Sequence, residues 1–192
     1  MKTVFFIVGV FLFINLKTQA QSAHFGLKAG LNVSAIKISD GNDFDSKAGF
    51  YGGGLVHIHI NKHFAVQPEL VYSMQGGKKG TLTRSLNYIN LPVLLQYMTA
   101  DGFRLQTGPQ IGFMVSGKDK VGNVEVKIND QLNTTDFSWS FGASYITKSS
   151  WGIDARYNLG ITNMNESESV PEGRNRVFQI GLFYQMHDHQ HH

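Results

Sequence analysis

The stretch HFGLKAGLNVSAI, residues 24–36, alternates apolar and polar residues along its length. Phe25, Leu27 and Leu31 fall on one side of an extended chain, and Lys28 and Asn32 fall on the other. In a soluble barrel or sandwich the apolar side faces a core and the polar side faces water. In a membrane barrel the apolar side faces lipid and the polar side faces the lumen. The rest of the sequence decides between these two orientations.

The composition favours β structure in an apolar environment. The chain has 192 residues, with 21 glycines, 12% aromatic residues and 16% charged residues, against about 25% charged residues in ordinary soluble domains. Cysteine is absent, which excludes disulfides, thiolate metal sites and a cysteine nucleophile. The formal net charge of +3 falls to +1 without Lys2 and Lys17, so no nucleic-acid partner is expected.

The first 20 residues have the pattern of a secretory signal peptide. Lys2 precedes an apolar run from Val4 to Ile14, and the small-residue sequence TQA ends at position 20. The run is shorter than the roughly 20 residues that a membrane-spanning helix needs. We therefore predict a cleaved signal peptide over residues 1–20, a barrel domain over 21–186 and a His-rich disordered tail over 187–192.

Eight alternating segments predict an all-β fold, an eight-stranded antiparallel up-and-down transmembrane barrel. Their lengths suit a tilted membrane crossing, which takes about 9–11 residues. Long polar connections are expected to alternate with short ones, as in outer-membrane barrels with external loops and periplasmic turns. The segments are 24–36, 48–60, 64–75, 87–98, 103–115, 136–146, 151–161 and 176–186, the long connections 36–47, 76–86, 116–135 and 162–175, and the short ones 61–63, 99–102 and 147–150.

One face of these segments carries no charged residue, which favours the membrane over a soluble, lipocalin-like barrel. A charge facing lipid at mid-bilayer costs about 2–4 kcal/mol. We place Leu91 to Leu95 on this lipid face, and an external aromatic girdle at Phe50, Tyr72, Tyr88, Phe113, Phe137 and Phe178. The lumen face is predicted to carry Lys28, Asn32, His57, Gln67, Glu69, Gln96, Arg104, Gln106, Gln110, Ser138, Asp154, Arg156, Gln179 and Gln185.

Three prolines fall inside the predicted strands. Each proline removes one backbone hydrogen-bond donor from its strand, as at Pro68, Pro92 and Pro109. A closed barrel has no edge strand on which the missing hydrogen bond would be without consequence. We therefore expect a β-bulge at each of them.

Five short motifs in order resemble the PorT-like outer-membrane β-barrel family of Bacteroidetes, often described as porin-family proteins. The resemblance spans the mature chain and implies the barrel fold and an outer-membrane location. The founding member is linked to a secretion system, but nothing in these motifs selects that role. The motifs are GLKAGLN (26–32), PELVYS (68–73), YINLPVLLQY (88–97), TGPQIGF (107–113) and DARYNLGI (154–161).

Charged residues on the lumen face predict an internal network. Glu69, Arg104, Asp154 and Arg156, with Lys28 nearby, are on the inward phase and fall in the periplasmic half of the barrel. An eight-stranded barrel is just wide enough for side chains to fill it. We therefore expect these charges to pair across the lumen and to close it to solutes.

Catalytic and metal sites are weakly indicated. His57 and His59 share the lumen face, with His63 nearby, but no inward carboxylate is placed beside them, and lumen filling is the preferred interpretation. No base, nucleophile and orienting group can be assembled from the pattern. We therefore expect no metal, no cofactor and no enzymatic activity.

The predicted function is a structural or loop-presenting binding role at the cell outer membrane. Outer-membrane lipid is the expected partner. The basic connection 76–86, with Lys78, Lys79 and Arg84, could contact lipopolysaccharide phosphates, but ordinary variation in surface charge is the preferred explanation. Two alternatives remain open. One is an accessory role in a secretion or envelope-assembly machine with envelope protein partners, and the other is a narrow passive pore.

Overall fold

The computed structural model describes residues 23–165 and 171–186, without the side chain of Gln131. The predicted signal peptide (1–20) and His-rich tail (187–192) lie outside the described residues. Within these residues no helix has the length and apolarity to cross a bilayer. The elements are β1 (Ala23–Ile38), β2 (Phe44–His59), β3 (Phe64–Lys79), β4 (Leu82–Met98), β5 (Phe103–Val121), β6 (Val124–Lys127), the 3-10 turn η1 (Asn129–Gln131), β7 (Thr135–Ile146), β8 (Trp151–Gly160) and β9 (Gly173–Gln185).

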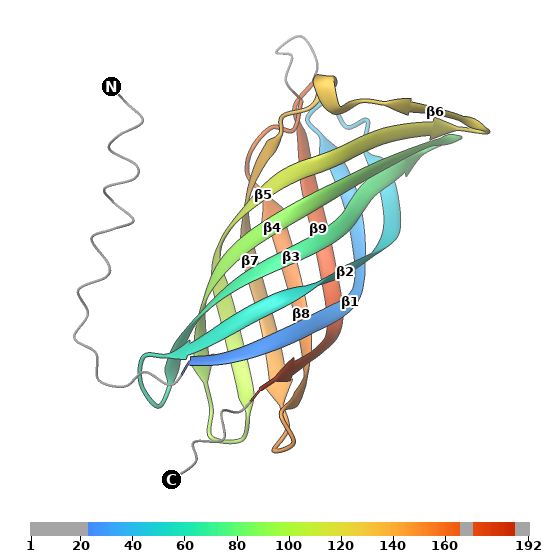
Figure 1. Cartoon of the computed structure of the whole chain (residues 1–192). Helices are drawn as coiled ribbons and strands as arrows, with labels where there is room; N and C mark the ends of the chain where they lie inside the picture. The colour runs from blue at the N-terminus through green and yellow to red at the C-terminus, as the bar shows by residue number, and fades with distance from the viewer. Residues whose placement is uncertain (1–22, 166–170, 187–192) are drawn as a thin grey trace.

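Eight of the strands form a closed antiparallel barrel, which confirms the predicted fold. Neighbours in sequence pair from β1 to β5, β5 then pairs with β7, and β7, β8 and β9 follow in order. Closure comes from β1 and β9, which pair from Gly26↔Gln185 to Ile38↔Gly173 (Figure 1). The short strand β6 was not predicted and pairs with β5 beyond the barrel.

The connections separate the barrel into two ends. The start of β1, the end of β9 and the turns 60–63, 99–102 and 147–150 lie together at one end, called here the turn end (Figure 1). The opposite end is called the loop end. One predicted long loop is wrong, because β3 and β4 pair as far as Lys79↔Leu82 and only Gly80 and Thr81 connect them. Gly80 has φ +57°, a conformation that glycine adopts without strain.

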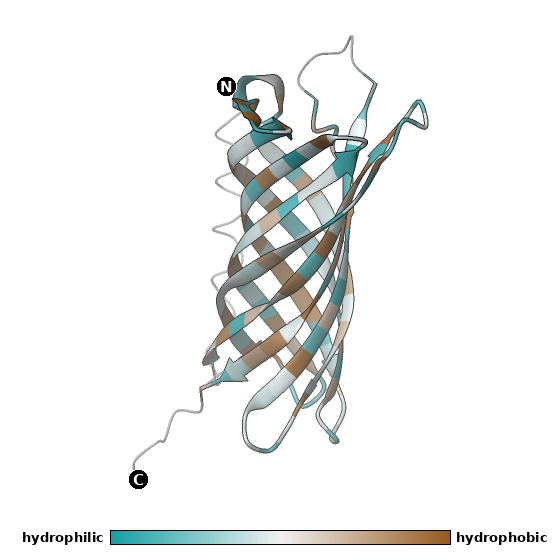
Figure 2. Ribbon diagram, turned by 90° about the vertical axis from the view of Figure 1, so that its right-hand side faces the viewer, coloured by the Kyte–Doolittle hydropathy of each residue, from teal (hydrophilic) through white to brown (hydrophobic). Residues whose placement is uncertain are grey.

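The alternation of apolar and polar residues matches the two faces of the barrel wall. Leu27 is 61% exposed on the outside, whereas its neighbour Lys28 is 5% exposed in the lumen. All fourteen predicted lumen residues are buried. Figure 2 shows the resulting alternation of hydrophilic and hydrophobic positions along the strands. The apolar face therefore points outward, as expected for a barrel that sits in lipid.

Three residues predicted on the outer face of β4 point into the lumen instead, namely Tyr88, Pro92 and Leu94. Tyr88, expected in an aromatic girdle, is 1% exposed, and Leu94, expected against lipid, is fully buried. All three, Pro92 included, lie an even number of residues from the lumen residue Gln96, and side chains along a strand alternate strictly. Their apolar character suggested lipid contact, but the period of the strand determines the face.

The prediction of bulges at the prolines is also wrong. Pro68 pairs with Val93, Pro92 with Gln110 and Pro109 with Trp139, and the register is the same on both sides of each proline. A proline removes one donor, and the pairs around it hold the strands in place. The irregularities lie instead at Ser34/Ile36, Asp45/Tyr51 and Asn87/Tyr88.

Candidate functional site

Four charged side chains form a buried ion-pair cluster across the lumen. Arg156 on β8 donates from Nη1 and Nη2 to the two carboxylate oxygens of Glu69 on β3, at 2.9 Å each. Lys28 on β1 lies 3.2 Å from Glu69 Oε2 and 3.2 Å from Asp154 Oδ1. Their side chains are 0–4% exposed. Two cations and two carboxylates therefore compensate each other where water is excluded.

Amide side chains complete the bonding of the two carboxylates. Gln67 Nε2 donates to Glu69 Oε1 at 2.8 Å, and Gln106 Nε2 donates to Asp154 Oδ2. These hydrogen bonds come from β3 and β5, so four strands hold the cluster once the amides are included, namely β1, β3, β5 and β8.

 A fifth strand, β2, adds Tyr51, whose ring centroid lies 5.7 Å from Lys28 Nζ.

Arg104 does not join this cluster, although the sequence placed it there. Its Nη2 donates to the neutral side-chain oxygen of Gln185 at 3.1 Å, not to a carboxylate. As the second residue of β5, Arg104 lies nearer the turn end than Asp154, which is the fourth residue of β8. The structure thus brings four of the five predicted residues together, and it places Arg104 closer to the turn end than the other four.

The Tyr51 side chain is buried in the lumen and lies against β1 and β9, next to two glycines. A Cβ atom at Gly30 would lie 2.8 Å from the Tyr51 ring, and one at Gly181 would meet its hydroxyl. At both positions the added Cβ would also lie closer than 3.0 Å to backbone atoms of the neighbouring strands. Glycine is therefore required where the ring and the barrel wall approach most closely.

Neutral amides and hydroxyls fill the middle of the lumen. Asn32 and Gln75 both donate to Ser73 Oγ, at 3.0 and 3.1 Å. On the opposite wall Ser140 donates to Asn158, which donates to Gln179, at 2.8 and 3.0 Å. These short polar chains cross between strands and occupy the space that a solute would need.

An apolar cluster closes the loop end of the barrel. Connections that the sequence presented as polar loops supply part of it, namely Ile128, Leu132 and Met164. Side chains on the inner wall supply the rest. The signal in the sequence was weak, because apolar residues such as Leu132 and Met164 stand among polar ones in these connections, and such residues occur on many surfaces. The cluster comprises Ile36, Phe44, Leu86, Tyr88, Met114, Ile128, Leu132 and Met164.

Hydrogen bonds join the two connections that supply part of this apolar cluster. Asn133 Nδ2 donates to the backbone oxygens of Asn163 and Asn165, at 3.0 and 3.1 Å. Leu132 and Asn165 also form an isolated antiparallel bridge. The segment after β6 is therefore bound to the segment after β8 across the mouth.

Beyond the barrel, β3 to β6 continue as a four-stranded extension, here called the loop-end sheet, residues 76–79, 82–87, 116–121 and 124–127. It holds six basic side chains and two acidic ones. Arg84 forms two hydrogen bonds with Asp119, at 2.8 and 2.7 Å. The pKa of Glu125 lies below its ordinary value, because Lys118 hydrogen-bonds its carboxylate and adds positive charge.

The histidines gather at the turn end. The rings of His57 and His59 lie 4.6 Å apart, and those of His24 and His59 lie 5.6 Å apart, both pairs nearly perpendicular. His63 stacks on Tyr97 instead, at 6.3 Å. Among the described residues no three His, Asp or Glu side chains are arranged to hold a metal ion.

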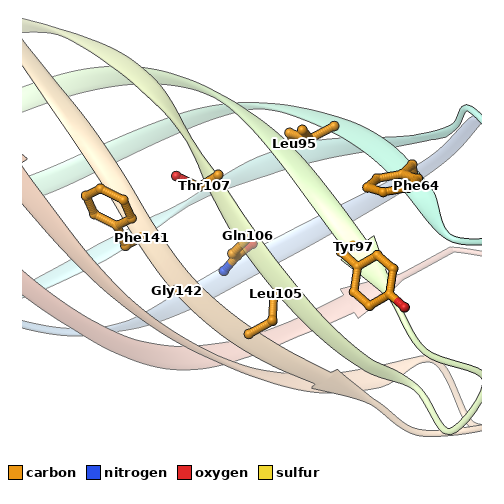
Figure 3. Close-up of a pocket in the computed structure, with 8 residues that line it drawn as sticks. All are labelled: Phe64, Leu95, Tyr97, Leu105, Gln106, Thr107, Phe141 and Gly142. Carbon is orange, nitrogen blue, oxygen red and sulfur yellow. The ribbon is translucent and has the colours of Figure 1, made fainter.

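A hollow of about 310 Å³ lies on the outer wall, over β4, β5 and β7 (Figure 3). Phe64, Leu95, Tyr97, Leu105 and Phe141 surround it, and Gly142 forms part of its floor. Its lining is almost wholly apolar. In a bilayer such a hollow is filled by acyl chains, so it is part of the lipid-facing surface.

Comparison with known proteins agrees with this architecture. The family model described as outer membrane protein beta-barrel domain matches residues 19–166. Neisserial surface protein A is similar in structure, with a TM-score of 0.64 and 16% identity over 86% of this chain and 99% of that chain. Ail, the attachment invasion locus protein of Yersinia pestis, has a TM-score of 0.55 and 12% identity over 86% and 99%.

Ail is also similar in its complex with the heparin analogue sucrose octasulfate, with a TM-score of 0.54 and 14% identity over 86% of this chain and 99% of that one. At these identities the likeness shows the fold alone. No curated protein matches the chain. The family match extends over most of the chain and agrees with a closed barrel that is apolar outside and polar inside. The chain belongs to the outer membrane protein beta-barrel domain family, and its place is the outer membrane.

Proposed function

We propose that this barrel conducts no solute and acts through the surface that it displays outside the membrane, in a structural or ligand-binding role. The turn end is assigned to the periplasm and the loop end to the exterior, because short turns face the periplasm in barrels of this kind. The protein then presents the loop-end sheet at the cell surface.

The observation that carries this proposal is the filling of the lumen along its whole length. The ion-pair cluster lies nearer the turn end, neutral amides fill the middle, and the apolar cluster closes the loop end. Moving an ion through this path would require breaking buried ion pairs and entering an apolar region, both of which are costly. A structural or binding role needs no such path.

Planar bilayer recordings test the closed lumen. The refolded barrel should give no stable unitary conductance at neutral pH, whereas an open porin reconstituted in the same way gives one. Reproducible single-channel steps from the purified barrel would overturn the proposal in favour of a narrow pore.

The ligand class that we propose is anionic. The loop-end sheet has an excess of four positive charges, from six basic and two acidic residues. Phosphates of lipopolysaccharide and sulfated glycans both match this charge. The complex of Ail with sucrose octasulfate is a precedent in a barrel of similar fold.

A second candidate is an accessory role in a secretion or envelope-assembly machine. It rests on the five motifs that resemble PorT-like barrels of Bacteroidetes. Cross-linking in intact outer membranes, followed by identification of the attached proteins, tests it. A reproducible envelope protein partner supports this role, and recovery of the barrel alone contradicts it.

We further propose that the protein is not an enzyme. Among the described residues, the four histidines lie at or near the turn end, far from the displayed surface. The buried carboxylates are engaged by Arg156 and Lys28 and are closed to a substrate. Incubation with outer-membrane lipids, followed by mass spectrometry, should show no modified product.

A further inference from the structure

The two faces of the loop-end sheet have different charges, and the strand register shows which residues share a face. Residues paired directly across antiparallel strands lie on the same face, and the next residue along each strand lies on the opposite face. Lys78 pairs with Thr83, Thr83 with Lys120, and Lys120 with Glu125. These four side chains therefore form one row across the sheet.

A second row lies on the same face, two residues along each strand. Gly76 pairs with Ser85, Ser85 with Lys118, and Lys118 with Lys127. Lys118 Nζ lies 2.5 Å from Glu125, a contact that joins the two rows directly. This face, here called the lysine face, carries Lys78, Lys118, Lys120 and Lys127 and, within the loop-end sheet, a single acid, Glu125; Asp45 of β2, which pairs with Lys78, adds a second acid at its edge.

The opposite face turns toward the barrel mouth, and its cations already have partners. Arg84 is paired with Asp119 and lies 5.0 Å from the ring of Phe44, which belongs to the apolar cluster. Lys79 lies 5.7 Å from the same ring and donates to the backbone oxygen of Asn42. The lysine face therefore points away from the mouth and carries most of the uncompensated charge.

The lysine face continues the lipid-facing wall of the barrel. On β3, Lys78 is an even number of residues from the outward-facing Tyr72 and Met74, so its side chain is on the same face of the strand. On β4 the same holds for Ser85 and Thr83 relative to the outward-facing Ile89. At about 3.3 Å per residue and a tilt of about 40°, Lys78 lies about 10 Å further from the membrane centre than Met74. The headgroup layer adds about 5–8 Å to each side of the hydrocarbon core.

We propose that the lysine face binds the phosphate groups of anionic lipid headgroups in the outer leaflet. This inference rests on the proposed function and names its partner. Lysine side chains are long enough to reach down to the headgroups from just above them. The face is continuous with the lipid-contacting wall, so its ligand is a neighbour in the membrane plane. A soluble polyanion would instead approach the exposed top of the sheet.

The test uses the full barrel in vesicles of phosphatidylcholine that contain a spin-labelled lipid. The measured quantity is the association constant of spin-labelled phosphatidic acid at the protein boundary, relative to that of spin-labelled phosphatidylcholine. The variant is K78Q/K120Q/K127Q, which keeps the Lys118–Glu125 pair. The matched control is K62Q/K79Q/K148Q, which removes the same charge from two turn-end connections and from the mouth-facing side of the sheet.

The wild-type barrel should select phosphatidic acid, and the lysine-face variant should lose at least about fivefold of that selectivity. The control should lose much less, and high salt should reduce wild-type selectivity. Equal loss in the two variants, or no wild-type selectivity, overturns the proposal. Gel mobility with and without heating confirms that each variant is folded.

A soluble ligand is a separate outcome of the same experiment. If dextran sulfate binds the wild-type barrel in phosphatidylcholine vesicles, but not the lysine-face variant, and lipid selectivity is equal in both, the lipid assignment is overturned. Conductance is recorded on the same preparations. Channel steps would refute the closed-lumen function, and they leave the result for the lysine face unaffected.

Discussion

Arg156 and Glu69 are 87 positions apart in sequence and meet in the lumen through two parallel hydrogen bonds of 2.9 Å. The pair joins β8 to β3 across the barrel, and Lys28 links Glu69 to Asp154. A buried pair of this geometry constrains how opposite walls of the barrel fit together.

We predict that Glu69→Ala and Arg156→Ala each destabilise the refolded barrel by about 3–5 kcal/mol, because each leaves a buried charge without its partner. The double variant should lose clearly less than the sum of the two. Denaturant unfolding measures all three. Glu69→Ala combined with Arg104→Ala is the control, and it should be nearly additive because Arg104 bonds to Gln185. Additive effects of less than a kilocalorie for Glu69 and Arg156 would contradict a coupled cluster.

Charge on the outer wall should block membrane insertion. Ile153 is 58% exposed on β8, so Ile153→Arg places a cation against lipid at a cost of about 2–4 kcal/mol. Asn123→Arg, in the turn between β5 and β6, adds the same charge outside the barrel and should be tolerated. The yield of folded protein in vesicles compares them, and equal yields would count against the assigned faces.

The apolar cluster should stabilise the loop end. Leu86 is fully buried there, so Leu86→Ala should cost about 2–5 kcal/mol of unfolding free energy. Val124→Ala is the control, because Val124 is 65% exposed on β6, and its effect should stay within about 0.5 kcal/mol. Similar effects of the two substitutions would show that the cluster contributes nothing beyond surface contact.

Gly181→Ala should destabilise the barrel by about 1–3 kcal/mol, since the added Cβ meets the Tyr51 hydroxyl and the backbone of β1. Gly52→Ala is a matched control on β2, because its Cβ would have no neighbour closer than 3.6 Å. Thermal unfolding distinguishes them. A Gly181→Ala barrel as stable as the Gly52→Ala barrel would refute the close packing of Tyr51.

Single cysteines test the orientation, because the chain has none of its own. Asn123→Cys at the loop end should react with a membrane-impermeant maleimide in intact cells. Asp101→Cys, in a turn-end connection, should react only after the outer membrane is permeabilised. The reverse pattern would invert the barrel and place the lysine face in the periplasm.

The strand period accounts for most of what the sequence alone determined. Side chains alternate strictly along a strand, so residues 24–36 already separated Leu27 from Lys28, and the same rule placed all fourteen lumen residues correctly. Predictions failed where residue type was given priority over the period, as with Tyr88 and Leu94. They also failed at the prolines, where the neighbouring pairs maintain the register without a bulge.

Tertiary structure decided which distant residues meet. The sequence gives the phase of a side chain but not its depth relative to other strands, so it could not separate Arg104 from the carboxylates or pair Arg156 with Glu69. Paired strands in the polar connections were also missed, although Val124, Val126 and Ile128 alternate with charged residues, because the run is short and lies among polar residues. The register across β3 to β6, which places four lysines on one face, exists only once those strands are paired.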